Sequence, residues 1–126
     1  MKATNPPPHR SLALPRVRSE LLLYLQELEA DDPRRKWQEE RQQGLVSGID
    51  QVFHFFFDDH PFDEADIGVV FFNQDELTAV EAVKRALDTV LKAIGDAGDD
   101  EFVEHPLWQD VTRAATIARS QLCARS

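Results

Sequence analysis

The chain has 126 residues, a formal net charge of −9 at pH 7 and a hydrophobic fraction of 42%. This length suits one domain with its own core, and the acidity argues against nucleic acid as a partner, because its phosphates would be repelled. No apolar run approaches the roughly 20 residues of a membrane span, and the first residues lack a signal peptide's apolar region. We therefore expect a cytoplasmic protein that binds no membrane.

The N-terminal part of the chain predicts an arm followed by a helix. Three consecutive prolines make residues 1–14 a flexible, proline-rich arm. Residues 15–126 then form a single helical domain. Pro15 suits the first turn of a helix, and an apolar stripe that starts at Val17 predicts that this helix ends near Ala30.

A charged helix with one large apolar residue, Trp37, is expected next. Asp32, followed by proline, favours its start. Gly44 favours its end, because a glycine inside a helix costs about 1 kcal/mol. Ser47 and Asp50 offer a capping box for a new helix. The alternative is one long helix that runs through the glycines.

The sequence VFHFFF is the most aromatic stretch of the chain. At helical spacing, Phe53, Phe56 and Phe57 are expected to form an aromatic cluster in the core. Phe55 would then point elsewhere and be exposed. The proline that follows His60 predicts a helix end by Asp59.

The β-branched and aromatic residues at 67–72 favour a short extended segment. No second strand is expected in the chain, so this segment has no internal partner. It either crosses the core alone or pairs with the same segment of a second copy, which would make a homodimer.

The clearest helix is predicted from Asn73 to Gly95. Asn73 is a good N-cap, with Glu76 at the capping-box position and Leu77 placed for a hydrophobic staple. Gly95 is a natural C-terminal stop. The predicted buried stripe comprises Leu77, Val80, Val83, Leu87, Val90, Leu91 and Ile94.

The last part of the chain predicts an acidic loop and a final helix. Phe102 and Val103 are expected to pin the loop to the core, and Pro106 to open the helix. Cys123, the single cysteine, excludes an internal disulfide and is expected to be a small apolar filler. The buried side of this helix would comprise Leu107, Trp108, Val111, Ala115, Ala118 and Leu122. The fold class is thus mainly α: a compact bundle of four to five helices.

Acidic residues crowd the two loops at the ends of the clearest helix. The first loop holds Asp58, Asp59, Asp63, Glu64 and Asp66, and the second holds Asp96, Asp99, Asp100, Glu101 and Glu104. No lysine or arginine lies between Arg41 and Lys84, or between Lys92 and Arg113. All of these acids except Asp96 are our candidate binding residues for a basic protein partner, which such a field would attract. Whether the loops form one patch stays open.

A metal site is the alternative use of the first loop. His54, Asp58 and His60 are its candidate ligands. No recognised metal motif has this spacing, so His54 bonded to Asp58 on a helix surface is the preferred interpretation. The sequence has no phosphate loop, nucleophile elbow or zinc-protease motif, and we expect no cofactor.

Several spaced motifs together resemble a known family. They are Trp37, Asp58-Asp59, Ile67-Gly68, Ala79-Val80, Ala82, Ala86-Leu87, Val90-Leu91 and His105-Pro106-x-Trp108-x-x-Val111. This pattern, over about residues 30 to 122, resembles a family of small uncharacterised proteins that are frequent in actinobacteria. The family has no established activity. In size and charge the chain is also similar to immunity proteins that neutralise bacterial toxins.

Three functions are compatible with these features. The leading hypothesis is a cytoplasmic protein-binding module, immunity-like, that binds a basic protein through its acidic loops. The second is a metal-assisted or acid/base enzyme centred on His54, Asp58 and His60, which we favour less. The third is a self-associating domain with no other partner.

Overall fold

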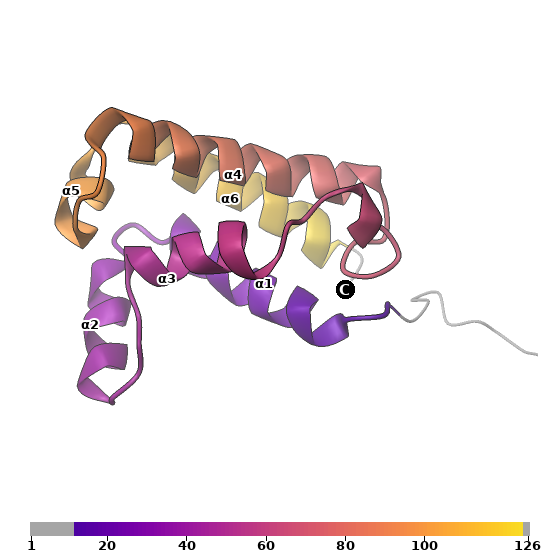
Figure 1. Ribbon diagram of the computed structural model, residues 1–126, viewed down its shortest axis with the longest axis horizontal. Helices are drawn as coiled ribbons and strands as arrows, with labels where there is room; N and C mark the ends of the chain where they lie inside the picture. Colours follow the sequence, from indigo (N-terminus) through magenta and orange to yellow (C-terminus); the bar gives the residue numbers. More distant parts are fainter. Residues whose placement is uncertain (1–11, 125–126) are drawn as a thin grey trace, which may run out of the picture.

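The computed structural model describes residues 12–124. The flexibility expected for residues 1–11 of the arm lies outside the described residues. In chain order (Figure 1) the elements are α1 (Pro15–Glu29), α2 (Arg34–Gln42), α3 (Ile49–Phe53), the π-helical turn η2 (His54–Asp59), the 3-10 turn η3 (Glu64–Asp66), α4 (Gln74–Ile94), α5 (Asp99–Glu104) and α6 (Trp108–Cys123). Residues 12–124 contain no strand. The predicted mainly α bundle is confirmed: α1, α2, α4 and α6 are its longer helices, and α3 and α5 are short.

The centre of the bundle consists of α1, α4 and α6. Helices α4 and α6 run side by side (Figure 1), and α1 packs against α6. Their fully buried side chains are Leu21, Leu25 and Leu28 of α1, Leu77, Val80, Val83, Leu87 and Val90 of α4, and Val111, Ala115, Ala118 and Leu122 of α6. The apolar stripes predicted for these three helices therefore face one another, as helical periodicity requires. Among the described residues, no helix has the length and apolar character needed to cross a membrane.

A buried ion pair joins the ends of these helices. The two terminal nitrogens of Arg18 donate to the two carboxylate oxygens of Glu76, at 2.8 and 3.0 Å. Arg18 also donates to the backbone carbonyls of Val70, at 3.0 Å, and Leu122, at 2.9 Å. Both charged side chains are almost fully buried. This bidentate pair, which the sequence analysis did not foresee, ties α1, the turn before α4 and the end of α6 together.

The limits of α4 agree with the prediction. The side chain of Asn73 accepts the backbone N–H of Glu76 at 3.0 Å. The Glu76 carboxylate accepts the N–H of Phe72 at 2.8 Å, one residue before the position that a capping box uses. At the other end Gly95 has a φ of +72° and donates to the carbonyl of Leu91 at 2.7 Å. Glycine adopts this conformation at no steric cost.

Two separate helices occupy the region where one long helix was the alternative. The Asp32 carboxylate accepts the backbone N–H of Arg34 at 3.0 Å, and α2 begins at that residue. Gly44, with a φ of +85°, lies just beyond the end of α2. Trp37 is the only buried residue within α2, as expected. Its indole N–H donates to the carboxylate of Glu27 at 2.9 Å and so links α2 to α1.

The capping box predicted for α3 is wrong. The Ser47 hydroxyl donates to the Glu40 carboxylate, and Gly48 occupies the N-cap position without a side chain to offer. The N–H of Ile49 donates instead to the carboxylate of Asp99, at 2.9 Å. A residue fifty positions away in the sequence therefore caps this helix, which no local pattern indicates.

The assignment of the aromatic residues is partly wrong. Phe56 is buried as predicted, but Phe55 is buried as well, with only 3% of its surface exposed, whereas Phe57 is 40% exposed. The reason is the π-helical turn η2: its wider i→i+5 spacing rotates the side chains away from their α-helical positions. Phe55 consequently stacks on Tyr24 of α1, with ring centroids 4.3 Å apart. As predicted, the helical segment ends at Asp59.

Residues 67–72 are non-helical but do not run straight. They form a turn in which the N–H groups of Val69, Val70 and Phe71 all donate to the carbonyl of Asp66, and a single bridge joins Ile67 to Phe71. Val70 and Phe71 are buried. The expectation that the segment has no internal partner is wrong, because the N–H groups of Ala13 and Leu14 donate to the carbonyls of Gly68 and Val69, at 3.3 and 2.9 Å. The segment presents no extended edge that could pair with a second copy, and the homodimer stays a prediction without this interface.

The C-terminal part differs from the prediction in three details. Most of the expected acidic loop is the short helix α5, pinned by the buried side chain of Phe102 as predicted. Pro106 lies in a turn, and α6 begins two residues later, at Trp108. Cys123 is exposed, so its interpretation as an apolar filler is wrong.

Candidate functional site: an acidic cleft beside an ion-pair network

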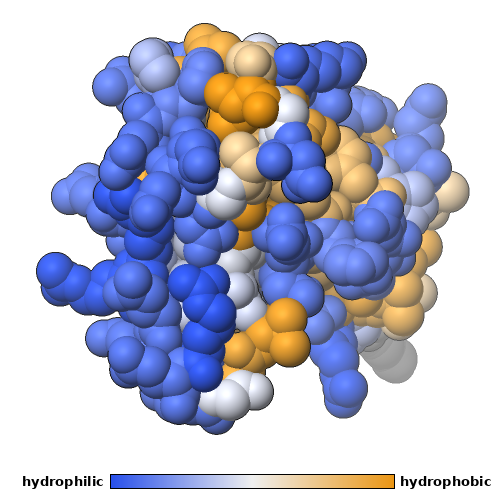
Figure 2. All heavy atoms as spheres, turned by 60° about the vertical axis from the view of Figure 1, so that its left-hand side comes forward, coloured by the Kyte–Doolittle hydropathy of each residue, from blue (hydrophilic) through white to orange (hydrophobic). Residues whose placement is uncertain are grey.

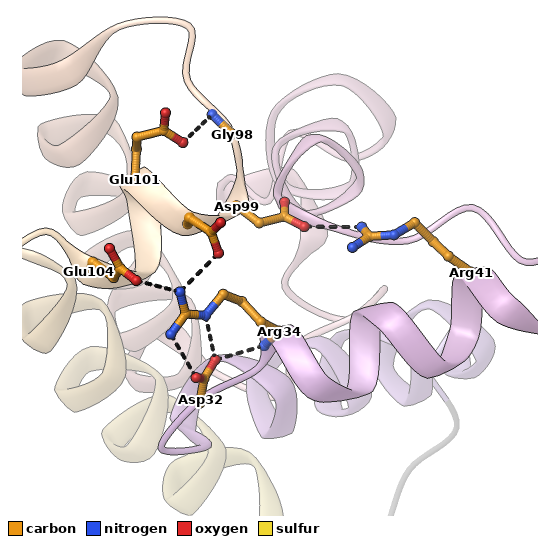
Figure 3. A network of polar contacts seen from close by, with 8 residues as sticks. Asp32, Arg34, Arg41, Gly98, Asp99, Glu101 and Glu104 are labelled. Atoms are coloured by element: carbon orange, nitrogen blue, oxygen red, sulfur yellow. Dashed lines mark hydrogen bonds and ion pairs between the residues drawn. The ribbon is translucent and has the colours of Figure 1, made fainter.

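The acids of the second predicted loop, except Asp96, bind other groups of the same chain (Figure 3). One terminal nitrogen of Arg34 donates to Asp100 at 2.9 Å and to Glu104 at 2.7 Å. The Glu101 side chain accepts the N–H of Gly98 at 3.1 Å and caps α5. The contacts of Arg34 connect α2 to α5, and the contact of Glu101 caps the N-terminus of α5. The charges of Asp100 and Glu104 are thereby partly neutralised inside the molecule.

Asp99 has two internal partners. One carboxylate oxygen accepts from Arg41 at 3.0 Å, and the other caps α3 at Ile49. Its side chain is only 21% exposed. Gly48 leaves room for this arrangement, since an added Cβ would lie 2.9 Å from Arg41 and 3.0 Å from Asp99. Asp99 of α5 therefore links α2 and α3 to α5.

Arg34 is the centre of the network. Its side chain also binds both carboxylate oxygens of Asp32, at 2.9 and 2.8 Å. These hydrogen bonds lower the pKa of Asp32 to about 2 and raise the pKa of Arg34 further above its ordinary value. Three carboxylates therefore surround one guanidinium, and all of them are exposed to solvent.

The acids of the first predicted loop serve different purposes. The carboxylate of Asp63 accepts the N–H of Ala65 at 3.0 Å, and that of Asp66 accepts the N–H of Asp63 at 3.2 Å, which caps the 3-10 turn η3. Asp59 and Glu64 are exposed, and neither forms an ion pair within residues 12–124. Phe62 of the same loop lies in the core, although the sequence analysis gave it no role.

A cleft of about 330 Å³ opens where α3 and η2 face the C-terminal half of α4. Its lining residues are Asp50, Phe53, His54, Phe57, Asp58, Asp88, Leu91, Asp96, Ala97 and Phe102. Five of them are apolar and four are aspartates, whereas lysine and arginine are missing from the lining. Because Asp58 follows α3 and Asp96 follows α4, the cleft brings one acid from each predicted loop to one place.

Two of the four aspartates already have a partner within the chain: Lys92 for Asp88 and His54 for Asp58. Asp88 forms an ion pair with Lys92 at 2.9 Å, one helical turn away. Nδ1 of His54 lies 3.0 Å from the Asp58 carboxylate, as the preferred interpretation of His54 predicted. Asp50 and Asp96 are exposed, and among the described residues neither forms an ion pair. The unpaired negative charge of the cleft therefore lies at Asp50 and Asp96.

The side of the molecule that carries α2 and α5 is mostly hydrophilic. Figure 2 shows this side with hydrophilic side chains over most of its surface and hydrophobic residues exposed in separate areas between them. Outside the cleft, the apolar residues with the largest exposed fractions in residues 12–124 include Val46, at 79%, Leu23 and Leu45. Val46 and Leu45 belong to the segment that connects α2 to α3.

The candidate metal ligands do not come together. The ring of His60 packs against Phe55 and Phe62, with centroids 5.3 and 5.4 Å apart, whereas the side chains of His54 and Asp58 line the cleft. Within residues 12–124 no three His, Cys, Asp or Glu side chains form a group that could hold a metal ion. These residues present a hydrogen-bonded histidine at a cleft instead.

A second hollow, of about 210 Å³, lies between α1 and the connection from α2 to α3. Burial raises the pKa of Glu27, against the opposing effect of the hydrogen bond from Trp37. Burial, followed by the charge of Glu27, raises the pKa of Tyr24. Because the Glu27 carboxylate already accepts from the indole, we assign it the structural role of joining α1 and α2.

Sequence reasoning missed three of the four cleft aspartates as binding residues. The sequence analysis places Asp50 in a capping box, gives no binding role to Asp88 and counts Asp96 only as part of an acidic loop. A signal did exist: the absence of lysine and arginine from residues 42–83 and 93–112 applies to Asp50 and Asp96 as well. What the sequence does not show is that the two segments meet.

The fold and the site define a small helical domain with an acidic, apolar-lined cleft. The chain belongs to the family described as "Domain of unknown function (DUF7945)", whose model matches residues 12–126. The match includes every cleft and network residue named above. Comparisons with curated proteins and with solved structures found no match.

Proposed function

We propose that this protein is a binding module for a basic protein partner, and that the partner docks at the acidic cleft. One observation carries the proposal: an apolar hollow is lined by four aspartates and by no lysine or arginine. Apolar surface supplies affinity when it is buried, and unpaired carboxylates select and steer a cationic partner.

The residues proposed for binding change as a consequence. Asp99, Asp100 and Glu104 have arginine partners inside the chain, which reduces their attraction for a second cation. We therefore place the contact at Asp50, Asp58, Asp88 and Asp96. Of these, only Asp58 is among the binding residues predicted from the sequence. Asp59 and Glu64 would contribute to the long-range field.

The size and the acidity of the chain support a more specific form of this proposal. Immunity proteins that neutralise nucleic-acid-cleaving toxins must cover a cationic active site, and an acidic cleft has the complementary charge. We propose that this protein has such an immunity-like role and acts in the cytoplasm. We also propose that it is related to the small actinobacterial proteins that it resembles. The metal-assisted alternative gains no support from the separated positions of His54 and His60.

The test compares two variants that change the net charge equally. The cleft variant is D50N/D58N/D96N, and the control variant E20Q/D31N/E39Q alters three exposed acids of α1, α2 and their connection. Proteins captured from the native lysate by wild type would be identified, purified and measured for association with all three forms. We expect the cleft variant to associate at least about tenfold more slowly, with a strong salt dependence, and the control to resemble wild type.

Two results would contradict the proposal. Equal association of the cleft variant and wild type would show that the aspartates are a solvated surface only. Equal losses in both triple variants would show that net charge, and not the cleft, attracts the partner. Circular dichroism of each variant checks that the fold is retained.

A further inference from the structure

The dimensions of the cleft limit what can enter it. Its volume of about 330 Å³ lies near the lower end of the roughly 300–1,000 Å³ of ligand pockets. An α-helix is about 10 Å across with its side chains, so a helix does not enter such a hollow. One long side chain does.

The apolar lining suits a side chain with a flat or aliphatic body. Phe53 and Phe57 stack with ring centroids 5.7 Å apart, and Phe102 packs edge-on against Phe53 at 5.4 Å. Phe57 remains 40% exposed although it is a large apolar residue. The ammonium group of Lys84 lies 5.3 Å from the centre of the Phe57 ring, so this ring already contacts one cation.

The charges at the rim require a cationic end. Asp50 and Asp96 have no ion-pair partner among the described residues, and Asp58 and Asp88 are within the same lining. A guanidinium group has five N–H donors in one plane, can bind a carboxylate through two parallel hydrogen bonds, and stacks on aromatic rings. An ammonium group offers a more compact and more strongly hydrated charge. The combination of aromatic wall and several carboxylates therefore favours arginine.

We propose that the cleft binds one arginine side chain of the partner, with its methylene groups against Phe53, Phe57 and Leu91 and its guanidinium between Asp50 and Asp96. This inference rests on the proposed function and specifies its central contact. It implies that the partner presents an arginine on a protruding loop or terminus.

The probe is a blocked tripeptide, acetyl-Gly-Arg-Gly-amide. The control is the same peptide with citrulline in place of arginine, because citrulline has nearly the same shape without the charge. Backbone amide shifts of the full-length protein would be followed by NMR during titration. We expect the arginine peptide to shift the amides of Phe53, His54 and Ala97 with a Kd on the order of 1 mM, and the citrulline peptide to bind at least about tenfold more weakly.

Variants then separate the cleft from the rest of the acidic surface. D50N/D96N should weaken the arginine peptide about tenfold, while E20Q/E39Q should leave its Kd within about twofold of wild type. Equal shifts with citrulline, shifts that centre on α2, or no shift at about ten times the expected Kd would overturn the inference. The proposed function would survive such a failure if the captured partner still distinguished D50N/D58N/D96N from its control.

Discussion

Arg18 and Glu76 illustrate how one pair of residues fixes several elements. The ion pair is almost completely buried, and Arg18 also satisfies the carbonyls of Val70 and Leu122. Removing two charges from water is costly, and only further hydrogen bonds repay that cost. Glu76 meets this condition with the N–H of Phe72. Loss of one partner therefore removes two charge-assisted hydrogen bonds from the core.

We expect Glu76→Ala to lower the free energy of unfolding by about 3–5 kcal/mol, because it removes one partner of a buried, bidentate ion pair. Asp75→Ala is the matched control: this neighbour is an exposed acid in the same first turn of α4 and should cost less than about 1 kcal/mol. Urea unfolding followed by circular dichroism measures both. Similar losses in the two variants would mean that the helix dipole, and not the buried pair, dominates.

The pH dependence of Asp32 follows from its contacts with Arg34. The folded pKa of about 2 lies below the ordinary value of 3.8, so the folded state releases this proton more readily than the unfolded state. The resulting stabilisation is present above pH 3.8 and is lost as the pH falls toward about 2. NMR titration of the Asp32 carboxyl carbon checks the value. Arg34→Gln should raise the midpoint toward 3.8, while the backbone N–H of residue 34, which also donates to Asp32, remains in this variant. An unchanged midpoint in that variant would refute Arg34 as the cause.

At the scale of elements, α5 acts as a clamp for its neighbours. Helix α2 has one buried residue, Trp37, and α3 has five residues, too few for an independent helix. Their positions depend on contacts with α5. Arg34 contacts Asp100 and Glu104, and Arg41 contacts Asp99 (Figure 3). The backbone N–H of Ile49 donates to Asp99 as well. Because α3 leads into η2, this clamp also positions one wall of the cleft.

We expect Asp99→Ala to cost about 1–2 kcal/mol, since it removes the N-cap of α3 as well as the partner of Arg41. Asp100→Ala removes one of three exposed carboxylates around Arg34 and should cost at most about 0.5 kcal/mol. Thermal or urea unfolding gives both values. If the two substitutions were equally mild, the cap on Ile49 would contribute nothing measurable.

The molecule as a whole combines a continuous core with a peripheral group of short helices. The contacts among α1, α4 and α6 are mainly apolar, and the buried Arg18–Glu76 ion pair adds to them. Helix α2 is attached to α5 through exposed ion pairs, which salt screens far more than buried ones. These two parts should therefore respond differently to ionic strength.

We expect added salt to speed amide hydrogen exchange in α2 and α5 and to leave exchange in the buried turns of α4 and α6 nearly unchanged. The reason is that the Debye length falls from roughly 10 Å at 0.1 M to about 3 Å at 1 M salt. Exchange measured by NMR at low and high NaCl tests this expectation. A uniform change across all helices would show that the molecule opens as one unit.

The sequence by itself determined the elements whose signals are local. The N-cap of α4 at Asn73, its stop at Gly95, the break after α2 and the buried stripes all follow from helical periodicity and capping chemistry, which act over a few residues. These signals also sufficed for a mainly α fold class. They failed where an unusual local geometry intervened, as in the π-helical turn that exchanged the positions of Phe55 and Phe57.

Only the tertiary structure decided which acids have partners and which do not. Asp99 binds Arg41 and caps α3, whereas Asp50 and Asp96, far apart in the sequence, meet at one cleft. Partners at such separations are chosen when helices pack, because the carboxylate interacts with whichever donor lies within about 3 Å. A count of charges along the chain is the same for a neutralised aspartate and a free one. The cleft, and with it the proposed arginine site, therefore follows from the tertiary packing and cannot be recognised in the sequence alone.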